Sequence, residues 1–155
     1  MRSLITLMVA ATSMAAGCGS GSFTLTGASV DPTYTCPVGA NNAPYDLHAI
    51  VDVHNGTSTP VTIKSMTAEM TLEAITGLWL EKVGDRYEAG NLSFAPASVA
   101  SGSNATLKVT IPSACTNAKA TNSASAGDYR VTIHLVTSAG TYSISSKNRH
   151  LLVAA

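Results

Sequence analysis

Apolar and polar residues alternate along most of the chain after residue 22, which is the pattern of half-buried β-strands. Residues 45–55 show it most clearly, because Leu47, Val51 and Val53 fall on one face of such a strand and polar residues fall on the other. Similar alternation is found in four further stretches, residues 22–30, 60–75, 104–112 and 128–146. We therefore expect a chain built almost entirely of strands.

Residues that favour turns separate these stretches. The sequence HNGTSTP at residues 54–60 is a tight connection, and a long loop rich in Ser, Ala and Asn occupies residues 112–127. Residues 151–153 form a last strand or extend the one before it. Seven or eight short strands with almost no helical periodicity predict an all-β fold, a single antiparallel β-sandwich. The least regular pattern is that of residues 77–103.

The N-terminal segment has a different pattern. Arg2 is the only charged residue before Asp31, and residues 4–16 are all apolar or small. This run of about 13 residues is typical of a secretory signal, and it is shorter than the roughly 20 residues that a membrane-spanning helix needs. We therefore expect the rest of the chain to be exported.

Three small residues, 15–17, come directly before Cys18. A small-residue triplet before a cysteine at the end of an apolar run resembles the lipobox of bacterial lipoproteins. The resemblance implies that residues 1–17 are a signal peptide and that Cys18 carries lipid, of which palmitate is one form. Residues 18–22 then form a Gly/Ser tether to a domain of residues 23–155.

Lipidation also implies a location, the extracytoplasmic side of the bacterial cell envelope, with the membrane as a partner through the lipid on Cys18. Because residue 19 is Gly and not Asp, the family's sorting pattern favours the outer membrane over the inner one. The alternative is an ordinary signal peptide cut after Ala16 or nearby, which leaves Cys18 free.

The charge of the chain excludes one class of partner. Removal of residues 1–17 leaves 138 of the 155 residues, enough for one domain, and the loss of Arg2 reduces the basic residues from 9 to 8 against 9 acidic ones. Charged residues make up 12% of the sequence and form no basic stripe. We therefore expect no binding to nucleic acid.

The remaining cysteines predict a disulfide. The chain has three cysteines, so lipidation of Cys18 leaves Cys36 and Cys115. An oxidising compartment favours a bond between them. Two buried free thiols are the alternative, and a shared metal site is disfavoured because neither cysteine has a second Cys or His at ligand spacing.

Two stretches resemble bacterial immunoglobulin-like modules. AGDYRVTIHLVTSAG (residues 126–140) resembles their passage from strand F to strand G, and VDVHNGTSTPVTI (residues 51–63) resembles the passage from strand B to strand C. The resemblance implies an Ig-like β-sandwich in which Tyr129 is a structural tyrosine corner, with its hydroxyl bonded to the preceding loop. It also places the loops that contain Cys36 and Cys115 next to each other at one end, opposite the end where the chain enters.

The sequence contains no catalytic motif: we find no Gly-x-Ser-x-Gly, no His-Glu-x-x-His and no phosphate-binding loop. We therefore expect neither an enzyme nor a cofactor. An alternative function is that of a copper or zinc carrier or sensor, which would use His48 or His134 with Met66 or Met70. Methionines more often fill cores, and surface histidines are usually solvated, so the prediction assigns no metal site.

We predict a non-catalytic binding or structural module with a protein or glycan partner in the envelope. Loops are where sandwiches bind, and the irregular segment 77–103 holds three aromatic residues. Trp79, Tyr87 and Phe94 are therefore the candidate binding residues. Trp79 lies between two leucines, so it is either an exposed anchor or part of the core.

Overall fold

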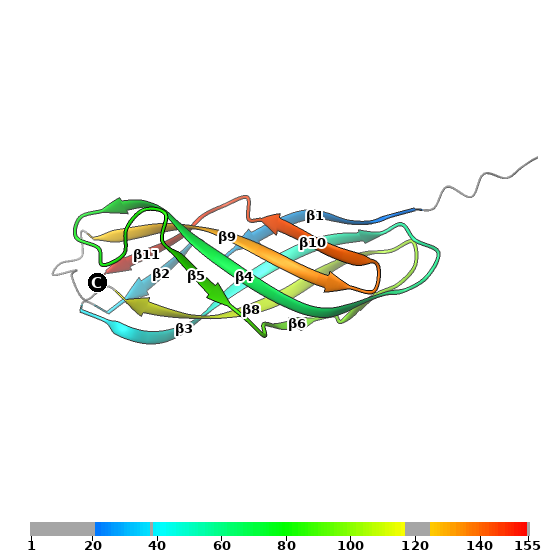
Figure 1. The fold of residues 1–155 in the computed structure, drawn as a ribbon, viewed down its shortest axis with the longest axis horizontal. Helices are drawn as coiled ribbons and strands as arrows, with labels where there is room; N and C mark the ends of the chain where they lie inside the picture. The colour runs from blue at the N-terminus through cyan, green and yellow to red at the C-terminus, as the bar shows by residue number, and fades with distance from the viewer. Residues whose placement is uncertain (1–20, 38, 117–124, 155) are drawn as a thin grey trace, which may run out of the picture.

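A computed structural model describes residues 21–37, 39–116 and 125–154, so Cys18 and the predicted signal peptide lie outside the described residues. Within these ranges the chain forms eleven strands (Figure 1). They are β1 (Phe23–Val30), β2 (Thr33–Cys36), β3 (Asn41–Asn55), β4 (Val61–Thr76), β5 (Arg86–Ala89), β6 (Ser93–Ala95), β7 (Ser98–Val99), β8 (Asn104–Thr116), β9 (Ala126–Thr137), β10 (Gly140–Ser145) and β11 (His150–Ala154). The described ranges hold no helix that is long and apolar enough to cross a membrane.

The strands form two sheets that pack face to face (Figure 1). The smaller sheet has four strands in the order β1-β3-β8-β6. The larger sheet has seven, with the path β2-β11-β9-β4-β5 and with β10 beside β9 and β7 beside β4. The prediction of an all-β, Ig-like sandwich is confirmed. The predicted number of strands was too low, and the sheets are not purely antiparallel, because β2 and β11 run parallel.

The structure has more strands than predicted because a stretch of alternating apolar and polar residues can be divided into two strands that pair with different neighbours. β1 pairs with β3 in the smaller sheet, whereas β2, which follows after Asp31 and Pro32, pairs with β11 in the larger one. β10 and β11 likewise pair with different halves of β9. Which strand a segment pairs with depends on segments far away in the sequence. The local alternation of apolar and polar residues therefore does not show where one strand ends and the next begins.

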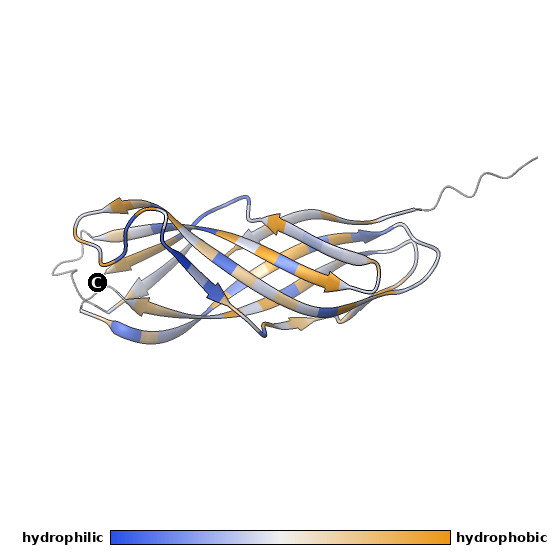
Figure 2. Cartoon of the chain, viewed as in Figure 1, coloured by the Kyte–Doolittle hydropathy of each residue, from blue (hydrophilic) through white to orange (hydrophobic). Residues whose placement is uncertain are grey.

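The core lies between the sheets and follows the alternation of the sequence. Figure 2 shows hydrophobic and hydrophilic residues following one another along the long strands. Leu47 and Val51 of β3 and Leu107 of β8 are completely buried, as the period of two predicts. The inward face of β9 contributes Val131 and Ile133, which are buried to the same extent.

Three local predictions need correction. The strand predicted over residues 104–112 continues to Thr116, whereas the alternating stretch of residues 60–75 corresponds to the single strand β4, Val61–Thr76. The long loop predicted from residue 112 is therefore shorter, and its residues 117–124 lie outside the described part of the chain. The irregular segment contains the three short strands β5, β6 and β7, which are too short for alternation to reveal.

The two ends of the sandwich differ. At one end, the Gly56 amide donates a hydrogen bond to the Ser22 carbonyl (2.9 Å), so the chain enters beside the connection between β3 and β4. At the opposite end β3 begins, with Asn41 paired to Thr116 at the end of β8, and Figure 1 shows the C-terminus there as well. This second end holds the disulfide, and we call it the disulfide end.

Candidate functional site

Cys36 and Cys115 form a disulfide, as the sequence predicts. Their Cα atoms are 5.8 Å apart and both residues are completely buried. Cys36 is the last residue of β2 in the larger sheet, and Cys115 lies in β8 of the smaller sheet. The bond therefore joins the two sheets from within strands, and not from the loops in which the sequence placed the two cysteines.

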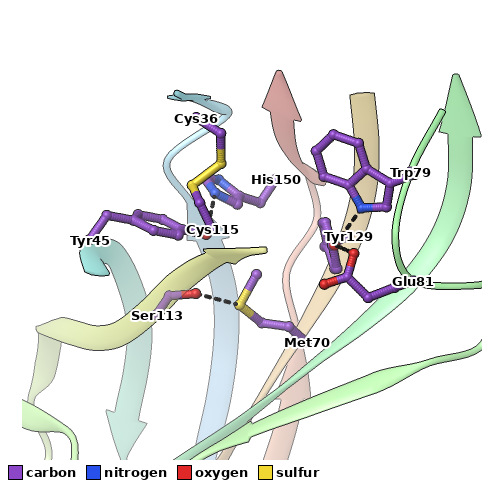
Figure 3. The surroundings of a disulfide bond; sticks show 9 residues. All are labelled: Cys36, Tyr45, Met70, Trp79, Glu81, Ser113, Cys115, Tyr129 and His150. Carbon is purple, nitrogen blue, oxygen red and sulfur yellow. Dashed lines mark hydrogen bonds between the residues drawn. A yellow bond between two sulfur atoms is a disulfide. The ribbon is translucent and has the colours of Figure 1, made fainter. Parts of the chain in front are cut away.

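A buried hydrogen-bonded pair lies beside the disulfide (Figure 3). His150 Nδ1 lies 2.6 Å from the carbonyl oxygen of Asp31, and Nε2 lies 3.1 Å from the Tyr45 hydroxyl. A carbonyl only accepts, so Nδ1 carries the proton and Nε2 accepts from Tyr45, which defines the neutral tautomer. Burial lowers the pKa of His150, although its hydrogen bond to Asp31 acts in the opposite direction. Burial raises the pKa of Tyr45 to about 12.

This pair predicts that acid destabilises the protein. Between the lowered folded-state pKa of His150 and its unfolded value of about 6.5, the unfolded chain binds a proton that the folded chain excludes. The free energy of unfolding should therefore fall as the pH falls below about 6.5, by up to about 1.4 kcal/mol per pH unit, and level off below the folded pKa. Urea denaturation between pH 7.5 and 5 measures this slope.

The histidine responsible is identified by replacement. His150→Gln should flatten the slope, whereas the matched control His134→Gln should keep it, because His134 is exposed on the outer face of β9. An unchanged slope in His150→Gln would show that other groups cause the pH dependence.

Of the two positions that the sequence left open for Trp79, the structure shows the one in the core and not the exposed anchor. The side chain is 7% exposed, and Nε1 donates to the Tyr129 hydroxyl at 3.0 Å. A Cβ atom at Gly127 would lie 2.7 Å from the indole ring, so the ring packs directly on the glycine backbone. Its neighbour Leu78 faces outward and is 58% exposed.

Tyr129 is structural, but its partners differ from those of a tyrosine corner. The hydroxyl accepts from Trp79 and donates to Glu81 Oε2 at 3.4 Å, so both described bonds go to the segment after β4 and not to the preceding loop (Figure 3). Burial raises the pKa of Tyr129 above its ordinary range. Burial also raises the pKa of the Glu81 carboxyl, and this effect outweighs the bond from Tyr129.

A cleft of about 150 Å³ opens next to this group, between β8 and the segment that leads into β5. Strands of both sheets contribute to its lining. The lining residues are Asn42, Met70, Glu81, Tyr87, Ser113, Ala114, Thr116, Tyr129 and Leu152. Figure 3 shows the Glu81 carboxylate on the side of Tyr129 that faces Met70 and Ser113.

The structure separates the three predicted binding aromatics. Tyr87 lines the cleft, is 43% exposed, and donates from its hydroxyl to the Pro112 carbonyl (3.1 Å). Phe94 lies on β6, partly buried against the core. Sequence reasoning missed Glu81, the charged residue of the cleft. No local signal could have found it, because Glu81 lies in an irregular connection between β4 and β5, where the period of a strand does not predict the direction of a side chain.

The residues of the metal alternative do not come together. Met66 and Met70 are 1% and 2% exposed and point into the core, whereas His48 and His134 are exposed on outer faces. His48 instead contacts the Asp31 carboxylate at 3.0 Å. Among the described residues no group of three or more His, Cys, Asp or Glu side chains is arranged to hold a metal ion.

No protein-family model and no curated protein sequence matches the chain. Among solved structures, the chain is similar to a PapD-like domain of human CEP192, with 11% identity, a TM-score of 0.35, and coverage of 100% of this chain and 97% of that one. It is similar to a Bordetella pertussis protein named ApaA, with 19% identity, a TM-score of 0.41, and coverage of 87% and 97%.

A third similar structure is the CooA pilin subunit of enterotoxigenic Escherichia coli, with 11% identity, a TM-score of 0.29, and coverage of 84% of this chain and 99% of that one. Because the identities and TM-scores are this low, these likenesses carry no argument about function. The assignment of the fold rests on the strand order and register of this chain.

Proposed function

We propose that the protein is a lipid-anchored, non-catalytic Ig-like module that binds a partner in the bacterial cell envelope through its disulfide end. The lipobox-like sequence before Cys18 supports the anchor. The disulfide supports an oxidising, extracytoplasmic location, because such bonds persist outside the cytoplasm.

The observation that carries this proposal is the placement of the two ends. The chain enters the sandwich at Ser22, beside Gly56, at the end opposite the disulfide. The Gly/Ser residues 19–22 span only about 11 Å on average, so an anchor at Cys18 would hold the entry end close to the membrane. The disulfide end would then face away from the membrane, toward a partner.

The disulfide end also exposes apolar side chains on a fixed loop. Leu78 and Val83, in the connection between β4 and β5, are 58% and 60% exposed. Backbone bonds hold this connection in place: Gly84 donates to the Leu72 carbonyl (2.8 Å), and Leu72 donates to the Asp85 carbonyl (3.0 Å). Exposed apolar groups on a rigid support are typical of a contact surface.

Lipidation is tested at Cys18. The wild-type protein, expressed in a bacterium with labelled palmitate, should incorporate label and enter the detergent phase on phase separation. Cys18→Ala should lose both the label and the partitioning, because several acyl chains are needed for stable membrane attachment.

The matched control is Ser20→Ala in the same tether, which should behave as the wild type. If Cys18→Ala remains in the membrane fraction, an uncleaved apolar segment and not lipid holds the protein there, and the anchor proposal fails.

A further inference from the structure

Half of β8 is an open strand edge beside the cleft. On its outer side β8 pairs with β6 through residues 108–110 alone, because β6 begins at Ser93, opposite Thr110. Beyond this pairing, residues 111–116 of β8 have β3 on one side and no hydrogen-bonded strand of the described chain on the other. This free edge has the cleft directly beside it, since Ala114 and Thr116 belong to both.

Two prolines show which backbone groups point outward along this edge. Pro112, which has no N–H, stands within β8, and Pro44 of β3 stands opposite Ala114. A proline in a ladder is tolerated where its nitrogen faces away from the partner strand, so these pairs are not hydrogen-bonded. The N–H and C=O of Ala114 and Thr116 therefore face the free edge. The Tyr87 hydroxyl already occupies the Pro112 carbonyl.

The cleft next to this edge has one charged group. Glu81 is half-buried, and burial raises the pKa of its carboxyl. Glu69 and Glu73 each form an ion pair with arginine, but among the described residues Glu81 contacts no cation. Desolvation without a cationic partner is costly for a carboxylate, and a bound cation would offset it.

The rest of the cleft suits an aliphatic stem. Met70 and Leu152 line its interior, and Tyr87 and Tyr129 contribute aromatic rings. A cavity of about 150 Å³ is large enough for a benzene-sized group, and a lysine side chain combines an apolar stem of comparable size with a terminal cation.

We propose that the open edge of β8 at Ala114 and Thr116 receives an extended segment of a partner protein and that the neighbouring cleft takes a lysine side chain of that segment, paired with Glu81. Strand addition provides affinity through backbone hydrogen bonds, and a pocket for an alternate side chain provides specificity. This inference names the partner class for the proposed function and rests on it only for the outward orientation of the disulfide end.

The test uses the purified full-length protein in mild detergent and the peptide acetyl-Thr-Val-Lys-Val-Thr-amide. We expect saturable binding with the largest amide NMR shifts at Ala114 and Thr116. The same peptide with norleucine in place of lysine should bind about tenfold more weakly, because it lacks the charge-assisted bond. This comparison leaves the protein unaltered, so it cannot be confused with misfolding.

Variants of the protein then test the charged group of the cleft and the backbone edge separately. Glu81→Gln should weaken binding of the lysine peptide about tenfold, whereas the matched control Glu88→Gln, on β5, should not. Ala114→Pro removes one outward N–H at an edge position that tolerates proline, and it should also weaken binding. Equal binding of the lysine and norleucine peptides, or no shift at residues 114 and 116 at millimolar peptide, would overturn the proposal.

The two proposals fail separately. Binding of this peptide does not require lipid, so a Cys18→Ala protein should bind it as well as the wild type. If Cys18 proves not to carry lipid, the proposal of an edge site on β8 is unaffected. If the peptide does not bind, the proposal of a lipid anchor is unaffected.

Discussion

Replacing Cys36 and Cys115 together by alanine should lower the free energy of unfolding by about 4 to 5 kcal/mol. The two cysteines are 79 residues apart, so the bond removes much of the freedom of the unfolded chain. It also joins β2 to β8, and β2 is otherwise held in its sheet by pairing with β11. Urea denaturation of the double variant and the wild type under non-reducing conditions measures the difference.

Two controls separate the disulfide from other effects. The wild type unfolded in the presence of reductant should approach the stability of the double variant, because both lack the bond. Cys18→Ala should unfold as the wild type does, since residue 18 precedes the sandwich. A difference below about 1 kcal/mol in the double variant would mean that the bond adds little to stability.

Trp79→Ala should lower the free energy of unfolding by about 3 to 5 kcal/mol, the range for truncation of a large buried aromatic side chain. The indole packs on the backbone at Gly127, so its removal leaves a cavity at the disulfide end. The Tyr129 hydroxyl also loses the hydrogen bond that it accepts from the indole and keeps only the one that it donates to Glu81, which adds to the cost. Thermal and urea denaturation measure the loss.

Two further variants serve as controls for the loss of stability in Trp79→Ala. Leu78→Ala should change stability by less than about 0.5 kcal/mol, because that side chain is 58% exposed. Trp79→Phe should fall between the two, since it keeps most of the packing but loses the hydrogen bond to Tyr129. Wild-type stability in Trp79→Ala would contradict the buried position of the indole.

The alternation of the sequence was sufficient to predict the inward faces of β3 and β9, because the direction of a side chain in a strand depends only on its local position. It was not sufficient at Trp79. Leu78, Trp79 and Leu80 are all apolar, and nothing local decides which one is buried. That depends on Gly127 and Tyr129, which are about 50 residues away and provide the surface and the hydrogen-bond acceptor for the indole.

The sequence by itself was enough to predict the all-β class and the pairing of Cys36 with Cys115, which the structure confirms, because the first follows from a local pattern and the second from a count of cysteines. The lipid site at Cys18 stays a prediction from the sequence alone. The tertiary structure alone decided the cleft at Glu81 and the free edge of β8. In the part of the chain that the structure describes, both depend on the extent of other strands: β6 begins opposite Thr110 and runs away from Ala114, and β5 places Tyr87 beside Pro112. Edges and clefts are made by distant segments meeting or failing to meet, and a one-dimensional pattern does not contain that information.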